Sequence, residues 1–174
     1  HFYWDHPEFL GGWWKYPAAH TNLSSISRYA AAPGVLFGAR IFGRPFLVTE
    51  FDFAAPNAFR AEGGVLTGAY AALQDWDGIY RFAWSHARET LNNQMIGGFD
   101  IAKDPAAQLA DRLVHALFLR GDLSPAPEQL AIRFDGGELY RDAGRRRRIL
   151  ISRASLPHRS SPGGETVSVG DTHR

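Results

Sequence analysis

The sequence predicts an α/β fold, with a parallel sheet and helices packed outside it. Three short apolar runs with strand-like composition are separated by segments with the features of helices. Strands that alternate with helices favour a parallel sheet, because a helix returns the chain to the same edge before each new strand. The chain has 174 residues, which is enough for one domain with a core. Three strand–helix units are too few for a closed eight-stranded barrel, which needs about 200 residues or more.

The three predicted strands are each short and apolar. Residues His1–Trp4 are expected to be the end of a buried strand, and a long loop containing Trp, Gly and Pro follows them. The run Pro45–Glu50 has the length and β-branching of a short buried strand. The third strand, "IYRFAWSH" at residues 79–86, begins after a helix break at Asp77-Gly78.

Helical segments are predicted between these strands. Residues 23–43 are expected to be helical in parts, with an interruption at Pro33-Gly34 and an end at Gly43. A longer helix is predicted from about Phe59 to Trp76. Its expected apolar stripe consists of Leu66, Tyr70 and Leu73.

The last predicted helix begins at Asp104-Pro105, after a loop at residues 87–103. An aspartate N-cap followed by proline in the first turn is a helix start signal. The carboxylate accepts free backbone N–H groups, and proline lacks the N–H that would stay unpaired. Three leucines are expected on one face of this helix: Leu109, Leu113 and Leu117.

The composition changes after residue 125, so the chain is divided into three regions. Residues 1–125 contain the strand–helix units. Residues 126–154 are expected to begin a small β domain with two or three antiparallel strands, which turn at Asp135-Gly136 and Ala143-Gly144. Residues 155–174 are rich in Ser, Pro, Gly and Arg, and we expect them to be disordered.

The bulk composition argues against several classes of function. A formal net charge of +1 gives no general attraction to nucleic acid or to an anionic membrane, and the run Arg145–Arg148 is interpreted as a solvated turn. The chain has no cysteine, which removes thiolate chemistry. His6, His20 and His86 have no metal-ligand spacing, so neither a metal nor another cofactor is expected. No apolar run is long enough to span a bilayer.

The N-terminus predicts a piece of a longer protein. It has no signal-peptide pattern, and it begins without methionine inside a strand-like run. The compartment stays open, with a secreted or periplasmic location among the options for the complete protein.

Polar and aromatic side chains gather near the predicted strand ends. The first strand carries His1 and Tyr3, the second ends in Glu50, and the third carries Trp84 and His86. In parallel α/β folds, the loops after the strands form the open rim where functional groups collect. An unpaired buried glutamate costs several kcal/mol. Glu50 is therefore either a solvated strand end or a group whose charge the site uses.

Three segments, "HFYWDHP", "GRPFLVTEF" and "LQDWDGIYRFAWSH", together resemble strands six, seven and eight of the retaining (β/α)8-barrel glycoside hydrolases, often called clan A. The resemblance covers roughly residues 1–125 and rests on the order and spacing of the segments. It implies a partial TIM barrel with a short C-terminal antiparallel β extension. It also implies a glycosidase that acts on a β-linked glycoside or polysaccharide, with a carbohydrate as its binding partner.

The resemblance implies roles for the residues at the three strand ends. Glu50 matches the catalytic nucleophile of the clan. His1 and Tyr3 match its His-x-Tyr pair, with Tyr3 donating a hydrogen bond that keeps Glu50 ionised. Trp84 matches the tryptophan that forms the floor of the sugar subsite. Further contacts with the sugar are expected from His86, Asn57 and Arg60.

The resemblance also implies that part of the enzyme is missing. In the clan the acid/base glutamate follows an asparagine at the end of the fourth strand, and this chain starts at the sixth. Retaining hydrolysis needs two carboxyl groups about 5–5.5 Å apart. We therefore expect a missing N-terminal half of the barrel that supplies the acid/base, and little or no activity from this piece alone.

Two other functions stay open. A non-catalytic carbohydrate-binding protein would use the aromatic rim without an acid/base. An unrelated α/β enzyme would use Glu50 as a general base. The loop aromatics Trp13, Trp14 and Tyr16 either line a substrate cleft or pack under a lid.

Overall fold

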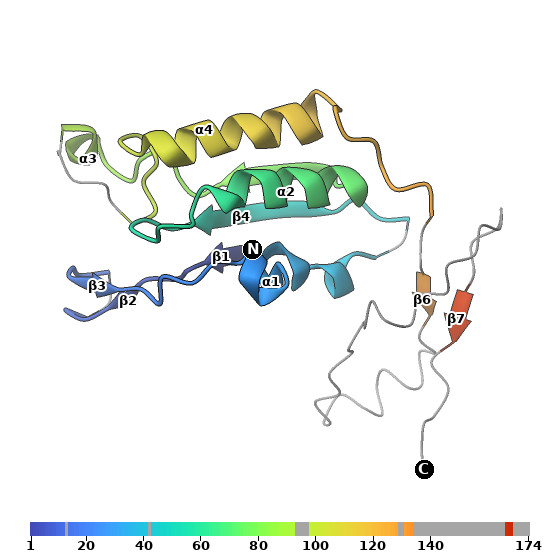
Figure 1. Cartoon of the computed structure of the whole chain (residues 1–174), viewed down its shortest axis with the longest axis horizontal. Coiled ribbons are helices and arrows are strands. Elements are labelled where there is room, and N and C mark those ends of the chain that lie inside the picture. The colour runs from blue at the N-terminus through green and yellow to red at the C-terminus, as the bar shows by residue number, and fades with distance from the viewer. Residues whose placement is uncertain (13, 42, 93–97, 129–130, 134–165, 169–174) are drawn as a thin grey trace, which may run out of the picture. The chain divides into compact units, whose positions relative to one another are not determined.

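The chain divides into two compact units, His1–Ala126 and Pro127–Arg174. A computed structural model describes residues 1–12, 14–41, 43–92, 98–128, 131–133 and 166–168 (Figure 1). The first unit contains a three-stranded parallel sheet in the order β1-β4-β5. Its strands are β1 (Phe2–Trp4), β4 (Leu47–Phe53) and β5 (Gly78–Arg81). The predicted parallel sheet is therefore confirmed, with its strands side by side in chain order.

Helices and short strands complete the first unit. The helices are α1 (Ala31–Gly34), α2 (Glu62–Leu73), α3 (Arg88–Asn92) and α4 (Pro105–Val114), with single turns η1 (Ile26–Arg28) and η2 (Phe37–Ala39) and a π-helical turn η3 (His115–Leu119). The predicted loop after β1 contains an antiparallel pair, β2 (Glu8–Phe9) and β3 (Ala18–Ala19). The predicted loop at 87–103 contains α3.

The core lies between the sheet and its helices. One cluster of buried side chains joins Phe2 of β1, Phe51 of β4, Ala32 of α1 and Ala71 of α2. Because these residues form one cluster, α1 and α2 pack against the same set of strand side chains. Helix α4 continues this layer by packing along α2, and Figure 1 shows the two helices side by side.

The buried face of α2 is not the face that the sequence predicted. Its buried residues are Gly63, Gly64, Thr67, Gly68, Ala71 and Ala72. Leu66 and Tyr70 are only partly buried against the core, and Leu73 is exposed. The reason is the close approach of α4, because a Cβ atom on Gly64 would lie 2.0 Å from the backbone oxygen of Ala110.

The start of α4 is confirmed, whereas its predicted apolar face is wrong. The Asp104 carboxylate accepts hydrogen bonds from the backbone N–H groups of Ala106 and Ala107. The helix buries Ala107 and Ala110. Leu109 and Leu113 are exposed, and Leu117 is half-buried. A contact as close as that between α2 and α4 admits small side chains and excludes leucine.

The strand boundaries differ from the predicted ones at functionally important places. The predicted strand 45–50 extends to Phe53 in β4, so Glu50 lies inside the strand and not at its end. The predicted strand 79–86 stops at Arg81. Val48 pairs with Ile79 and Phe51 pairs with Arg81, so β4 has one extra residue between these two pairs. Glu50 therefore lies in a β-bulge.

In the second unit, the described residues form one parallel pair, β6 (Ala131–Arg133) with β7 (Thr166–Ser168). We predicted disorder for 155–174, and the strand at 166–168 differs from this expectation where it is described. The antiparallel strands expected within 126–154 stay a prediction, because β6 pairs with a strand outside that range. The predicted turns at Asp135-Gly136 and Ala143-Gly144 and the run Arg145–Arg148 lie outside the described residues.

Gly64→Ala is expected to destabilise the chain by about 1–3 kcal/mol, because the added methyl group has to push α2 and α4 apart. The control is Gly38→Ala, since a Cβ atom on Gly38 meets nothing within 4 Å. Urea unfolding of the two variants and the unchanged chain measures the difference. Equal unfolding free energies for Gly64→Ala and Gly38→Ala would contradict the close helix contact.

Candidate functional site

Aromatic rings from three segments meet beyond the carboxyl ends of β1 and β5. Phe99, which is buried, lies at the centre of this aromatic cluster. Its ring centroid is 4.9 Å from that of Tyr3, 5.5 Å from that of Trp14 and 5.8 Å from that of Phe82. The other members are His6, Phe9, Tyr16 and His86. The cluster thus joins the loop after β1, the segment after β5 and residues 98–100.

Backbone hydrogen bonds hold the segment that carries Phe99. The N–H of Ala83 donates to the Phe99 oxygen at 2.9 Å, and the N–H of Ala55 donates to the Gly98 oxygen at 2.8 Å. The hydroxyl of Tyr16 accepts from the N–H of Gly98 at 2.7 Å. The segment is therefore tied to the ends of β4 and β5 and to the loop after β1.

Three aromatic side chains in the segments after β1 and β5 are exposed to solvent. The exposed fractions are 46% for Trp14, 59% for Tyr16 and 60% for Trp84. We call these three residues the exposed aromatics; Trp13 lies outside the described residues. The rings of Trp14 and Tyr16 both contact Phe9. Large exposed rings that lie together are typical of binding surfaces, because isolated soluble folds rarely leave such area uncovered. An aromatic face offers a flat apolar surface to a ligand.

Glu50 is half-buried in the bulge of β4. Among the described residues, no hydrogen bond or ion pair involves the side-chain carboxylate of Glu50. Tyr3 pairs in register with Asp52, two residues beyond Glu50, so the expected Tyr3–Glu50 hydrogen bond is absent. Phe2 pairs with Phe51 in the register of β1 and β4. The residues that precede them, exposed His1 and Glu50, therefore lie level with each other in the sheet.

Asn57 and Arg60 are already occupied by contacts within the protein. Asn57 is buried, donating to the oxygen of Leu23 at 3.1 Å and accepting from the N–H of Phe59 at 2.7 Å. The guanidinium of Arg60 forms a two-pronged ion pair with Asp104. These contacts join the loop after β4 to the start of α4, and they leave few polar atoms of either residue for a ligand.

The sequence analysis missed a cluster of three ionisable side chains around Arg81. Nη2 of Arg81 lies 2.6 Å from Oδ1 of Asp52, and Nη1 of Arg81 lies 2.7 Å from Oδ1 of Asp111. The guanidinium carbon also lies 5.2 Å from the centre of the Phe51 ring. The cluster therefore joins β4, β5 and α4. Opposite charges inside two apolar strands, in "FDF" and "IYRF", are the sequence signal that could have found it.

Burial controls the protonation of this charge cluster. Asp52 is 1% exposed, and burial raises its pKa from the ordinary 3.8 to about 8, although the neighbouring Arg81 acts in the opposite direction. Burial also raises the pKa of Asp111 above its ordinary value. One guanidinium faces two carboxyl groups, buried Asp52 and partly exposed Asp111, so a proton on Asp52 removes the excess negative charge.

His86 and Asp100 form a hydrogen-bonded pair next to the exposed aromatics. The Asp100 carboxylate accepts from Nδ1 of the His86 ring and, at 3.1 Å, from the His86 backbone N–H. The His86 ring lies 4.7 Å from the Phe82 ring and 5.9 Å from the Trp14 ring, measured between centroids. The structure thus brings His86 into the aromatic cluster, as its position near the predicted strand end suggested.

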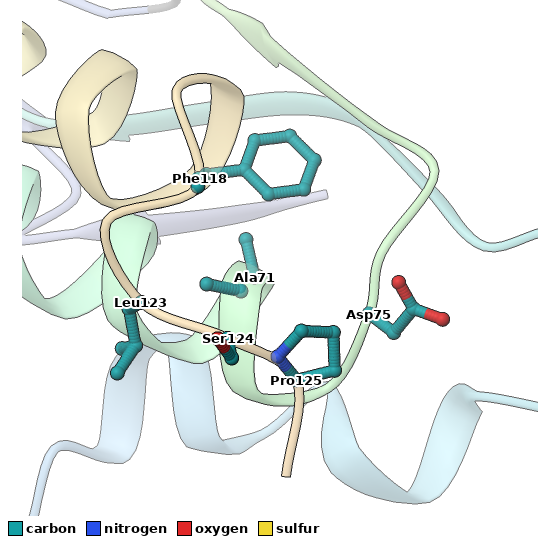
Figure 2. A pocket seen from close by; sticks show the side chains of 8 residues that line it. Ala71, Asp75, Phe118, Leu123, Ser124 and Pro125 are labelled. Atoms are coloured by element: carbon teal, nitrogen blue, oxygen red, sulfur yellow. The ribbon is translucent and has the colours of Figure 1, made fainter.

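A pocket of about 270 Å³ lies elsewhere, near the end of α2. It is lined by Ala71, Ala72, Asp75, Phe118, Gly121, Leu123, Ser124 and Pro125, and Figure 2 shows the Phe118 ring above Ala71 in the view. Helix α2 leads into β5, so this pocket lies on the side where the strands begin. In parallel α/β folds that side contributes mainly to stability. The pocket is therefore not the candidate site.

Among the described residues, no group of three His, Asp or Glu side chains is placed to hold a metal ion. No helix in the described ranges has the length and apolar character needed to cross a membrane. Comparison with protein-family models, with curated proteins and with solved structures gave no match for this chain. The functional argument therefore rests on the site itself.

Asp52→Asn is expected to flatten the pH dependence of stability. Folded Asp52 keeps its proton up to about pH 8, whereas the group releases it near 3.8 when the chain unfolds. The group therefore stabilises the fold fully below pH 3.8, and this contribution is lost as the pH rises through about 8. Urea unfolding across this range measures the decline. The exposed Asp122→Asn variant is expected to keep it, and an equal decline in Asp52→Asn would contradict the assignment.

Proposed function

We propose that the chain is the C-terminal part of a retaining (β/α)8-barrel glycoside hydrolase, with Glu50 as the nucleophile. The observation that carries this proposal is the position of Glu50. It lies in a β-bulge of the central strand, half-buried, and has no charged partner among the described residues. Bulges occur often beside active sites, because they change the direction of a side chain. A carboxylate held in this way is available to a substrate.

Glu50 would act by attack on the anomeric carbon of a β-linked glycoside. A bond forms between its carboxylate oxygen and that carbon, while the bond to the leaving oxygen breaks. A second carboxyl group protonates the leaving oxygen and later takes a proton from the water that hydrolyses the glycosyl-enzyme. Asp52 is a poor second carboxyl group, because it is 1% exposed and paired with Arg81. The acid/base is therefore proposed to lie upstream of this chain.

The order and direction of the strands are those that the proposed partial barrel requires. The strands are parallel and adjacent in chain order, and α1 and α2 pack against the same core cluster. Strands β1 and β5 are the outer strands of this described sheet, so each has one edge that no described strand covers. Unpaired strand edges favour addition of further strands. We propose that upstream strand–helix units pair with these edges and supply the acid/base.

The sugar-binding contacts are proposed to come from the exposed aromatics and the residues beside them. Trp84 would stack on a sugar ring, and His86 would contact a hydroxyl group. His1, level with Glu50, and Tyr3 would complete the site next to the nucleophile. Asn57 and Arg60 are left out of the proposed contacts, because the fold already uses their polar atoms.

A second candidate is a non-catalytic carbohydrate-binding protein. The specific observation in its favour is that no Tyr3 hydrogen bond orients Glu50, while Trp14, Tyr16 and Trp84 remain exposed without any need for a carboxylate. Covalent labelling separates the two candidates, because a nucleophile forms a bond to the sugar and a binding surface does not.

Glu50→Gln is expected to abolish covalent labelling by 2,4-dinitrophenyl 2-deoxy-2-fluoro-β-glycosides of glucose, xylose and mannose. Dinitrophenolate leaves without protonation, so the reaction tests the nucleophile without the upstream acid/base. Mass spectrometry of the 174-residue chain detects the adduct. Glu8→Gln, at an exposed glutamate of β2, is the control that keeps labelling. Labelling that persists in Glu50→Gln would contradict the nucleophile role.

Trp84→Ala is expected to lower the affinity for a β-linked hexasaccharide about tenfold, because removal of the indole removes its stacking surface. Isothermal titration with cellohexaose, xylohexaose, mannohexaose and laminarihexaose measures the change. Tyr29→Ala is the matched control, since Tyr29 is 98% exposed in a turn that contributes nothing to the aromatic cluster. An equal effect of both substitutions would argue against a sugar subsite at Trp84.

A further inference from the structure

The His86–Asp100 pair has the chemistry of a fixed hydrogen-bond acceptor. An ionised carboxylate only accepts hydrogen bonds, so the ring nitrogen that contacts it, Nδ1, carries the proton. In a neutral imidazole the other nitrogen, Nε2, then has a free lone pair. The Asp100 side chain is 12% exposed and the His86 side chain is 38% exposed. The carboxylate is thus largely covered, whereas the imidazole reaches the surface.

The backbone on both sides of Asp100 fixes the pair in place. The N–H of Ala83 donates to the oxygen of Phe99, and the N–H of Ile101 donates to the oxygen of Ala83, at 2.9 and 3.1 Å. Asp100 lies between these two bonds, and its carboxylate also accepts from the backbone N–H of His86. The carboxylate therefore contacts both the backbone and the ring of the same residue, which leaves the ring little freedom to rotate.

The surroundings of the ring limit what Nε2 can meet. The ring of Phe82, at 81° to the imidazole, and the indole of Trp14 flank the imidazole. Trp14 is itself half-exposed, and Trp84 lies two residues before His86 in the chain. A ligand at this position would therefore meet flat apolar faces and one nitrogen acceptor. A sugar ring matches this combination, since it has C–H faces and hydroxyl groups at its rim.

We propose that Asp100 is a positioning residue that holds His86 in the Nδ1–H form, so that Nε2 accepts a hydrogen bond from a hydroxyl group of a bound carbohydrate. The inference rests on the carbohydrate-binding function proposed for this edge of the sheet. It adds Asp100, which is not one of the residues predicted at the three strand ends, and it gives His86 a defined role as a hydrogen-bond acceptor.

The test compares three variants of the 174-residue chain: Asp100→Ala, Asp100→Asn and His86→Phe. Tryptophan fluorescence measures their affinity for cellohexaose, xylohexaose, mannohexaose and laminarihexaose. Asp100→Ala and His86→Phe are each expected to weaken binding about three- to tenfold, which is the loss of one hydrogen bond. Asp100→Asn keeps an oxygen acceptor and is expected to restore most of the affinity. The double variant Asp100→Ala/His86→Phe is expected to lose no more than either single variant, because Asp100 acts through His86.

The nitrogen chemical shifts of ¹⁵N-labelled His86 provide a readout that does not depend on a ligand. In the unchanged chain at alkaline pH, Nδ1 is expected to be protonated and Nε2 unprotonated, with this preference lost in Asp100→Ala. A pair that only ties the loop together would change the melting temperature and leave the affinity of the folded variant intact.

The outcomes separate the inference from the proposed function. Equal affinity of Asp100→Ala and the unchanged chain would overturn the positioning role and leave carbohydrate binding intact, as would a protonated Nε2 in the unchanged chain. No binding of any of the four hexasaccharides by the unchanged chain would overturn both the proposed function and this inference.

Discussion

The close contact between α2 and α4 is the constraint on which the rest of the first unit depends. Gly64 and Gly68 allow the backbone of α4 to lie directly against α2. This position brings Asp104 to Arg60 and Asp111 to Arg81. These ion pairs connect α4 to the loop after β4 and to the end of β5. The segment with Phe99 and Asp100 leads into α4, so the helix contact also determines where the aromatic cluster forms.

Two acids on β4, separated by one residue, have opposite environments. Asp52 is buried against Arg81 and holds its proton at neutral pH, whereas Glu50 lies in the bulge without a charged partner among the described residues. When two neighbouring carboxyl groups lie in different environments, they commonly have different roles. Asp52 belongs to the scaffold, which stabilises the end of the strand. Glu50 is the acid that we propose as the nucleophile.

Local chemistry was enough to predict the parallel sheet, the start of α4 at Asp104 and the approximate place of α2. It did not predict which helix faces are buried, because hydrophobic periodicity assumes that large residues fill the core. In α2 the opposite holds, because the glycines are buried and the large residues are less buried. The Tyr3–Glu50 hydrogen bond failed for another reason, since strand register depends on pairing between residues 49 positions apart in sequence, as in Phe2 and Phe51. The pairing of His86 with Asp100, 14 positions apart in sequence, had no local signal either.

Arg81 contacts two acids at once, so the residues at three positions on separate elements depend on one another. Each arm of its guanidinium serves a different acid, one on β4 and one on α4. A lysine has one compact ammonium group and lacks the planar fork that reaches two partners at once. Replacement of Arg81 would leave at least one acid in the interior without a charged partner. Divergence in this protein would therefore have to change residues 52, 81 and 111 together, or leave all three alone.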